Sequence, residues 1–351
     1  LLSWATMVAI ETPIRSRRVL AGRRALFAVA TLASLALVAA GLFVFNTPGL
    51  ERWTTPEQRA VLAPPASGRV LSQRCPAIEI GVAGEHPDCI LGRADGTPPR
   101  FAVLGDSHAG TVVDTLSDEA ERLGLAGLFF GRAACPPIVT VDRPITADRR
   151  CTENLEAALA RIAAADVRTV IVVSRWTLTV TGHDYARSPA QLRPLLVDGR
   201  MLREDEWRDV LLDRLGRTFD RLAGRRVIVV APIPEVRFDV PVAFANALRL
   251  GRPPPPGPTR AELDDRRRST LALLDAAAAG RPWVSRLDPA DLLCDAERCA
   301  IGDAGGPLYR DPDHLSKRGA DRLAPLFAEA LATALAPPPV PTPQAGTPAA
   351  P

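Results

Sequence analysis

The chain of 351 residues is 47% hydrophobic, which is enough for one sizeable core with accessory segments. Five arginines against one glutamate give residues 1 to 24 a net charge of +4, so an overall charge of +3 leaves about −1 for the remainder. A nearly neutral main domain lacks the concentrated basic face that nucleic-acid binding requires, and we expect no nucleic-acid partner.

A membrane-spanning helix is the first element that the sequence predicts. Residues 25 to 45 form an apolar run of 21 residues without a charge, long enough to cross a hydrocarbon core of roughly 30 Å. A cleaved signal peptide is the alternative, but such peptides have a shorter apolar core and a small-residue cleavage site, which FVFNTPGLERW does not offer. Arginines cluster before the run, so residues 1 to 24 are expected in the cytoplasm and everything after Asn46 outside it.

The segments around this helix and at the C-terminus have their own signatures. Residues 1 to 10 are an apolar run without an initiator methionine, so we expect residues 1 to 24 to be the remnant of a membrane domain with its basic cytoplasmic loop. Residues 46 to 99 are rich in proline and glycine and predict an extracytoplasmic stalk. Residues 337 to 351 lack core-forming side chains and predict a disordered tail.

Six cysteines all lie after the predicted span. An even number of cysteines in an exported domain favours disulfides, although the sequence alone does not choose among the possible pairings. A zinc site is the alternative, but no CxxC pair occurs. The cysteines fall into three locally spaced pairs, Cys75 with Cys89, Cys135 with Cys151, and Cys294 with Cys299.

From residue 100 onward, short apolar runs alternate with helical patterns. The runs TVIVVS and RVIVVA are continuous and β-branched, which is typical of strands covered on both faces. Residues 100 to 336 are therefore expected to form an α/β domain, a three-layer α/β/α sandwich with a parallel five-stranded sheet. The predicted strands are 100–105, 126–130, 168–174, 225–231 and 282–287, and the predicted helices lie near 108–123, 153–165, 204–222, 259–279 and 316–335.

A serine follows the first predicted strand in the sequence GDSH, residues 105 to 108. Ligands of open α/β sheets bind beyond the carboxyl ends of the strands, and a helix that begins there directs free N–H groups at the same point. A nucleophilic serine also needs a base and a group that orients the base. His314 precedes the last predicted helix, and Asp311, three positions earlier, would share one side of a turn with it.

Ser107, Asp311 and His314 are thus the candidate nucleophile, orienting acid and base, while the neighbouring Asp313 is expected to point elsewhere. The simpler interpretation is that Ser107 caps a helix and His314 is an ordinary loop residue. A metallophosphoesterase is another alternative, although its metal site would require more histidines than the four present. Its metal ligands would be Asp106, His108, Asp311, Asp313 and His314.

These blocks carry a family resemblance. GDSHA, CPP at 135 to 137, VVVSRW ending at residue 176, the last cysteine pair and PLYRDPDHLSKRGA resemble the exported SGNH hydrolase-like domains that are fused to acyltransferase family 3 membrane proteins. The stretch LSWATMVAIETPIRSRR is similar to the end of that membrane domain. The resemblance covers most of residues 70 to 335 and implies an SGNH (flavodoxin-like) sandwich with Ser107, Asp311 and His314 as its catalytic triad.

The chain also departs from SGNH hydrolases at large. It has no GxND block, which elsewhere supplies oxyanion donors, and shows Ser174-Arg175-Trp176 at the corresponding strand end. Gly131 is a candidate for the glycine of the second block, or a plain turn residue. Arg175 and Trp176 are candidates for a glycan or acyl platform, or for solvation and packing. The oxyanion or substrate candidates are accordingly Asp106, Gly131, Arg175 and Trp176.

The resemblance implies O-acylation, usually O-acetylation, of a cell-envelope polysaccharide through an acyl-serine. The acyl donor would be delivered by a membrane acyltransferase domain, the acceptor would be a glycan, and no metal or other cofactor is required. The protein would be anchored in the inner (cell) membrane with a periplasmic catalytic domain. A carbohydrate or acyl esterase is the alternative, and a non-catalytic glycan-binding module is a further one.

Overall fold

The computed structural model describes residues 2–19, 22–46, 54–62, 75, 88–144, 150–186 and 192–335. It divides into two units, Leu1–Arg59 and Ala60–Pro351. The predicted tail at 337–351 and much of the predicted stalk at 46–99 lie outside the described residues. Each unit is described by itself below.

The first unit contains a long apolar helix, α3, Arg23–Asn46. Its stretch Arg23–Phe43, 21 residues long, is apolar enough by length and composition to cross a membrane, and none of it is buried within the protein. This helix coincides with the span predicted at residues 25 to 45. A short helical segment precedes it, made of α1 (Leu2–Thr6), the π-helical turn η1 (Met7–Glu11) and α2 (Thr12–Arg15).

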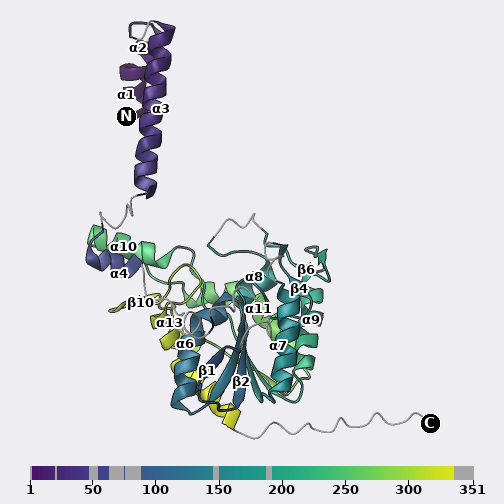
Figure 1. Ribbon diagram of the computed structural model, residues 1–351. Helices are drawn as coiled ribbons and strands as arrows, with labels where there is room; N and C mark the ends of the chain where they lie inside the picture. Colours follow the sequence, from purple (N-terminus) through teal and green to yellow (C-terminus); the bar gives the residue numbers. More distant parts are fainter. Residues whose placement is uncertain are drawn as a thin grey trace, which may run out of the picture. The chain divides into compact units, whose positions relative to one another are not determined.

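The second unit is built on a six-stranded sheet with the order β1-β3-β2-β5-β8-β9 (Figure 1). Five of these strands run parallel, as the sequence predicts: β2 (Pro99–Gly105), β3 (Ala126–Gly131), β5 (Thr169–Val173), β8 (Arg226–Val230) and β9 (Val284–Leu287). The sixth, β1 (Ile90–Gly92), pairs antiparallel with β3 at the sheet edge. The sheet therefore begins before residue 100, inside the segment expected to be stalk. The sequence analysis missed this strand because three residues are too few to show periodicity.

Helices cover both faces of the sheet and separate two cores. Phe101 and Val103 point into one core and the alternating Ala102 and Leu104 into the other, so the strand is buried on both sides as its unbroken apolar sequence indicates. This arrangement confirms the three-layer sandwich (Figure 1). Helices α6 (Ser107–Arg122), α13 (Lys317–Asp321) and α14 (Ala324–Ala332) contribute to the first core, and α7 (Cys151–Ala164), α9 (Trp207–Arg221) and α11 (Arg260–Ala278) to the second.

Two helix predictions need correction. The helix predicted at 316–335 is divided into α13, α14 and a 3-10 turn η3 (Thr333–Leu335), because Pro325 lies in the first turn of α14 and cannot continue a preceding helix. Helix α10 (Val240–Leu250) was not expected, although Asp239 caps it by accepting the Val242 N–H at 3.0 Å. The smaller elements are α4 (Pro56–Leu62), α8 (Trp176–Thr181), α12 (Ala290–Leu293), β4 (Val141–Asp142), β6 (Leu196–Val197), β7 (Arg200–Met201), β10 (Gly302–Asp303) and β11 (Gly306–Pro307).

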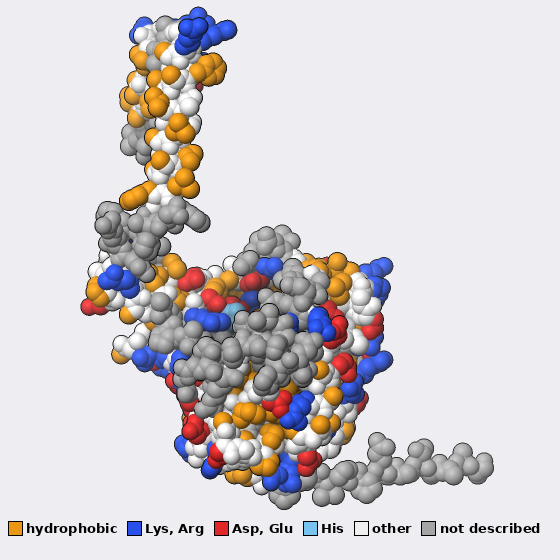
Figure 2. Space-filling view, in the orientation of Figure 1, with side chains coloured by type: hydrophobic (Ala, Val, Ile, Leu, Met, Phe, Trp, Pro, Cys, Tyr) orange, Lys and Arg blue, Asp and Glu red, His pale blue; other side chains and the backbone are white. Residues whose placement is uncertain are grey.

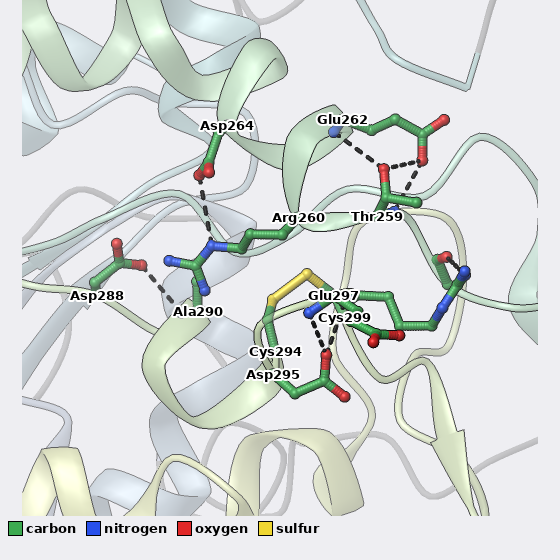
Figure 3. Close-up of a disulfide and its surroundings, with 12 residues drawn as sticks. Thr259, Arg260, Glu262, Asp264, Asp288, Ala290, Cys294, Asp295, Glu297 and Cys299 are labelled. Atoms are coloured by element: carbon green, nitrogen blue, oxygen red, sulfur yellow. Dashed lines mark hydrogen bonds and ion pairs between the residues drawn. A yellow bond between two sulfur atoms is a disulfide. The ribbon is translucent and has the colours of Figure 1, made fainter.

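The six cysteines form three disulfides, in the locally spaced pairs. Figure 3 shows the bond between Cys294 and Cys299, beside a turn in which the Asp295 carboxylate accepts the backbone N–H of Glu297 at 2.8 Å. The same view shows Thr259 capping α11, where its hydroxyl accepts the Glu262 N–H at 3.2 Å. The disulfide and the Asp295 turn fix the loop that follows α12, and the Thr259 cap fixes the start of α11.

The order of the parallel strands places the ligand edge of the sheet. The chain passes from β2 outward to β3 and then returns to β5 on the other side of β2, so the connections leave in opposite directions from the carboxyl ends of β2 and β5. Such a switch point is where open α/β sheets bind ligands. Gly105 ends β2 there, and only glycine fits, because a Cβ would lie 1.9 Å from the Val173 carbonyl oxygen.

Candidate active site

Ser107 is the first residue of α6 and directly follows the switch point. Asp106 caps the helix by accepting the His108 N–H at 2.9 Å. Its other carboxylate oxygen accepts the Ser174 hydroxyl at 2.6 Å and the Arg175 N–H at 2.8 Å, both beyond the end of β5. Asp106 therefore ties the two strand ends together and holds the backbone on which Ser107 is presented.

His314 and Asp311 meet Ser107 at this edge, from a loop about two hundred residues further along the chain. The distance from His314 Nε2 to Ser107 Oγ is 2.8 Å, and from His314 Nδ1 to Asp311 Oδ2 it is 2.7 Å. The other oxygen of Asp311 accepts the His314 N–H at 2.7 Å, which fixes the carboxylate in the turn. The geometry is that of a nucleophile, a base and an acid that orients the base.

Asp313 does not point elsewhere, contrary to the expectation from its position. Its Oδ1 lies 3.5 Å from His314 Nδ1, the same nitrogen that Asp311 contacts. Its Oδ2 lies 2.7 Å from Arg175 Nε and 3.3 Å from His108 Nε2. Local spacing misplaced Asp313, because the arginine that attracts it comes from a distant strand end.

Arg175 belongs to a buried network of charges and is not a free platform for substrate. Its Nε donates to Glu235 at 2.8 Å, and a terminal nitrogen donates to Asp184 at 3.1 Å. Glu235 is 4% exposed and also accepts from Arg266 Nε at 2.8 Å. Figure 2 shows a small histidine surface with basic and acidic side chains beside it on one face of the molecule.

The carboxylates change the basicity of the base. Burial lowers the pKa of His314, but hydrogen bonds to Asp311 and Asp313 outweigh burial and raise that pKa to about 9. Burial by itself would raise the pKa of Asp313, yet its contacts with His108, His314 and Arg175 hold that pKa well below the usual range. Asp313 is thus a carboxylate at neutral pH.

The surroundings of two oxyanion or substrate candidates favour the packing alternative of the sequence analysis. Trp176 is fully buried, and its indole N–H donates to the Val230 carbonyl at 2.9 Å, so it offers no surface to a substrate. Gly131 ends β3 in register with Gly105. A Cβ on Gly131 would lie 2.1 Å from the Phe129 ring, so packing against this ring explains why glycine occupies the position.

Several polar residues of the site were missed by the sequence analysis. Glu235 and Asp184 both anchor Arg175. Arg143 is 5% exposed and donates to Thr179 at 3.1 Å, and burial lowers its pKa to about 10. Glu235 had a usable signal, since it lies four residues beyond the carboxyl end of the predicted strand 225–231. Asp184 and Arg143 lie in irregular segments without such a signal.

A comparison with protein-family models identifies the family of this domain. The model described as "SGNH domain (fused to AT3 domains)" matches residues 74–329. The chain belongs to this family. The SGNH domain therefore contains all the strands of the sheet and the loop that carries Asp311 and His314.

Solved structures with similar folds include acyltransferases and esterases. The periplasmic domain of a lipopolysaccharide acetyltransferase from Salmonella ser. Paratyphi A is 14% identical, with a TM-score of 0.49 over 75% of this chain and 97% of that one. A lipase/acylhydrolase from Enterococcus faecalis is 13% identical, with a TM-score of 0.35 over 66% and 95%. No curated protein sequence matches the chain. At these identities the likeness extends to the fold alone.

A metal site is the alternative chemistry for the same corner of the SGNH domain. His108, Asp313 and His314 place possible ligand atoms within 4.8 Å of one another. Both ring nitrogens of His314 are already engaged, by Ser107 and Asp311. Arg175 Nε lies 2.7 Å from Asp313 Oδ2, the oxygen that faces His108. A divalent ion bound through this oxygen would have to displace the arginine, and one bound to His314 would displace a triad contact, so the donor set fits a triad better than a metal.

Proposed function

We propose that this protein is an O-acyltransferase that acylates a hydroxyl of a cell-envelope polysaccharide, most simply with acetyl, through an acyl-serine at Ser107. The observation that carries the proposal is the hydrogen-bonded series from Ser107 through His314 to Asp311, with distances of 2.8 and 2.7 Å. Such a series activates a serine for covalent catalysis. It needs no metal ion or organic cofactor.

The first half-reaction loads the enzyme. Ser107 Oγ attacks the carbonyl carbon of the acyl donor while His314 Nε2 accepts the hydroxyl proton. The bond from Oγ to carbon forms, the bond to the leaving group breaks, and the imidazolium returns its proton to the leaving group. Asp311 stabilises the charged imidazole. The Ser107 N–H at the start of α6 has no acceptor within the helix and is the candidate donor to the developing oxyanion, whereas the His108 N–H is already bonded to Asp106.

The second half-reaction transfers the acyl group. A glycan hydroxyl gives its proton to His314 and attacks the acyl carbon, and Ser107 leaves with that proton. Transfer is favoured over hydrolysis by the family, whose members are described as fused to AT3 domains, the membrane acyltransferases. Helix α3 is suited to anchor the chain beside such a donor, with the SGNH domain in the periplasm. We propose the domain boundaries of the sequence analysis on the same basis, except that the SGNH domain begins before β1 and includes the end of the predicted stalk.

An esterase would use the same triad with water in place of the glycan. The two are separated by incubating the full chain in detergent with 4-nitrophenyl acetate, with and without de-O-acetylated envelope polysaccharide of the producing organism. An acyltransferase places acetyl on the polysaccharide and releases less free acetate, whereas an esterase releases the same acetate in both reactions. Activity that disappears with a chelator would instead support metal-dependent chemistry.

The pKa of His314 predicts an alkaline pH profile. The imidazole must be neutral to accept a proton, and its pKa is raised to about 9. For 4-nitrophenyl acetate, kcat/KM should therefore rise with pH and reach its plateau above about 9. Stability changes in the opposite direction: the imidazolium stabilises the fold fully below its unfolded pKa of about 6.5, and this is lost as pH rises through the folded pKa. A profile that levels off near neutrality would contradict the prediction.

A further inference from the structure

We propose that Arg175 and Asp313 form a positioning bridge that aligns His314 with Ser107, with Asp313 acting as a second carboxylate at the imidazole. The inference rests on the proposed serine chemistry and adds two residues to it. Neither residue touches the reacting atoms, so both act through their neighbours.

Arg175 contacts the supports of both the nucleophile and the base from the end of β5, as His108 does from within α6. Its backbone N–H donates to Asp106, the cap that presents Ser107, at 2.8 Å. Its side-chain Nε lies 2.7 Å from Asp313, which adjoins His314 in the chain. A change in the position of Arg175 therefore alters the distance between Ser107 and His314.

The bridge is rigid on the sheet side. Arg175 lies two residues after the end of β5, and its backbone N–H donates to Asp106. Its guanidinium is held by Glu235 and Asp184. Its side chain is 14% exposed and that of Glu235 is 2% exposed. Charged hydrogen bonds in such surroundings are stronger than at the surface, so the guanidinium is a fixed point for Asp313.

The bridge gives the histidine loop a polar anchor in addition to its buried apolar side chains. Asp311 is held through backbone N–H groups of its own loop, at Asp313 and His314, and its side chain is 33% exposed. These bonds orient the imidazole within the loop but do not place the loop on the sheet. Asp313 does so through Arg175, and the Val236 N–H supports it by donating to the Pro312 carbonyl at 2.8 Å.

Asp313 also contributes a charge at the base. Its Oδ1 lies 3.5 Å from His314 Nδ1, within reach of a slightly rotated imidazole. The charged and titratable groups that face His314 among the described residues are Asp311 and Asp313 from its own loop, Ser107 and His108 from α6, and Arg175 through Asp313. The two carboxylates favour the imidazolium that forms during catalysis.

The test uses the full chain in detergent and kcat/KM for 4-nitrophenyl acetate across pH. Asp313→Asn keeps the shape but removes the charge, so the acid limb should move to lower pH and the plateau should fall about 10- to 100-fold. Loss of a triad acid typically lowers activity roughly 10⁴-fold. We expect a smaller loss in Asp311→Asn, because Asp313 remains, and a loss of that full size in the double variant. Arg175→Lys should lower the plateau, because one ammonium cannot reproduce the two directed hydrogen bonds and the ion pair to Asp313.

The matched control is Asp288→Asn, which alters another partly buried carboxylate paired with an arginine, Arg267, at 2.6 Å. It should lower the thermal midpoint without moving the pH profile. An unchanged limb and plateau in Asp313→Asn, together with no added loss in the double variant, would overturn the bridge. If Ser107→Ala keeps full turnover, the proposed function itself fails, so the two failures are distinguishable. Where Arg175→Lys does not fold, Asp313→Asn alone decides.

Discussion

Replacing Ser107 with alanine is expected to lower kcat/KM for 4-nitrophenyl acetate by about 10⁴- to 10⁶-fold. The Ser107 hydroxyl is the atom that His314 Nε2 contacts at 2.8 Å, and alanine leaves the base without a nucleophile to activate. Asp106, not Ser107, makes the capping hydrogen bond of α6, so the fold should be preserved. The measurement is initial-rate kinetics with the full chain in detergent.

Ser269→Ala is the matched control, because this serine is exposed on α11 and lies in the same domain. The control should have wild-type kinetics and the same thermal midpoint as Ser107→Ala. Retention of more than about one tenth of the activity in Ser107→Ala would be inconsistent with covalent catalysis at this residue.

Replacing Glu235 with alanine is expected to have the largest effect on stability. The carboxylate is 4% exposed and neutralises two guanidinium groups, those of Arg175 and Arg266, with both Nε contacts at 2.8 Å. Removing it leaves two largely buried cations without this partner, which typically costs about 3–5 kcal/mol of unfolding free energy. The change should appear in urea unfolding as a lower midpoint with a similar slope.

Glu156→Ala provides the comparison, because Glu156 pairs with Arg221 at 2.8 Å on the surface, with about half of the arginine side chain exposed. Its removal should change the unfolding free energy by less than about 1 kcal/mol. Equal small losses in the two variants would show that the Glu235 network contributes little. Glu235→Gln should fall between them, because the amide oxygen still accepts one of the two hydrogen bonds.

The sheet was predictable because its sequence signal is local. Buried parallel strands such as TVIVV at residues 169 to 173 are apolar on both faces, and they stand out between amphipathic helices. Strand β1 and helix α10 were missed for different reasons. The first has three residues and owes its pairing to β3, while the second is signalled mainly by a capping aspartate and a proline at its start.

The candidate triad was assembled from residues that lie far apart in sequence, by using strand ends and the family resemblance together. Asp311 and His314 are related by a turn, which a spacing argument can treat. Asp313 was misjudged, and the two alternatives for Trp176 stayed open, because long-range contacts decide both directions: Arg175 attracts Asp313, and the Val230 carbonyl accepts the Trp176 indole N–H. Periodicity and spacing contain no information about such partners.

The most direct test of the central claim is to trap the acyl-enzyme. The full chain is mixed with 4-nitrophenyl acetate, quenched in acid during the first turnovers, digested and mapped by mass spectrometry. Our account predicts one added acetyl group on the peptide that contains Ser107, absent from Ser107→Ala and lost when acceptor polysaccharide is supplied before quenching. Turnover with the acetyl group on another residue, or turnover that persists without Ser107, would contradict it.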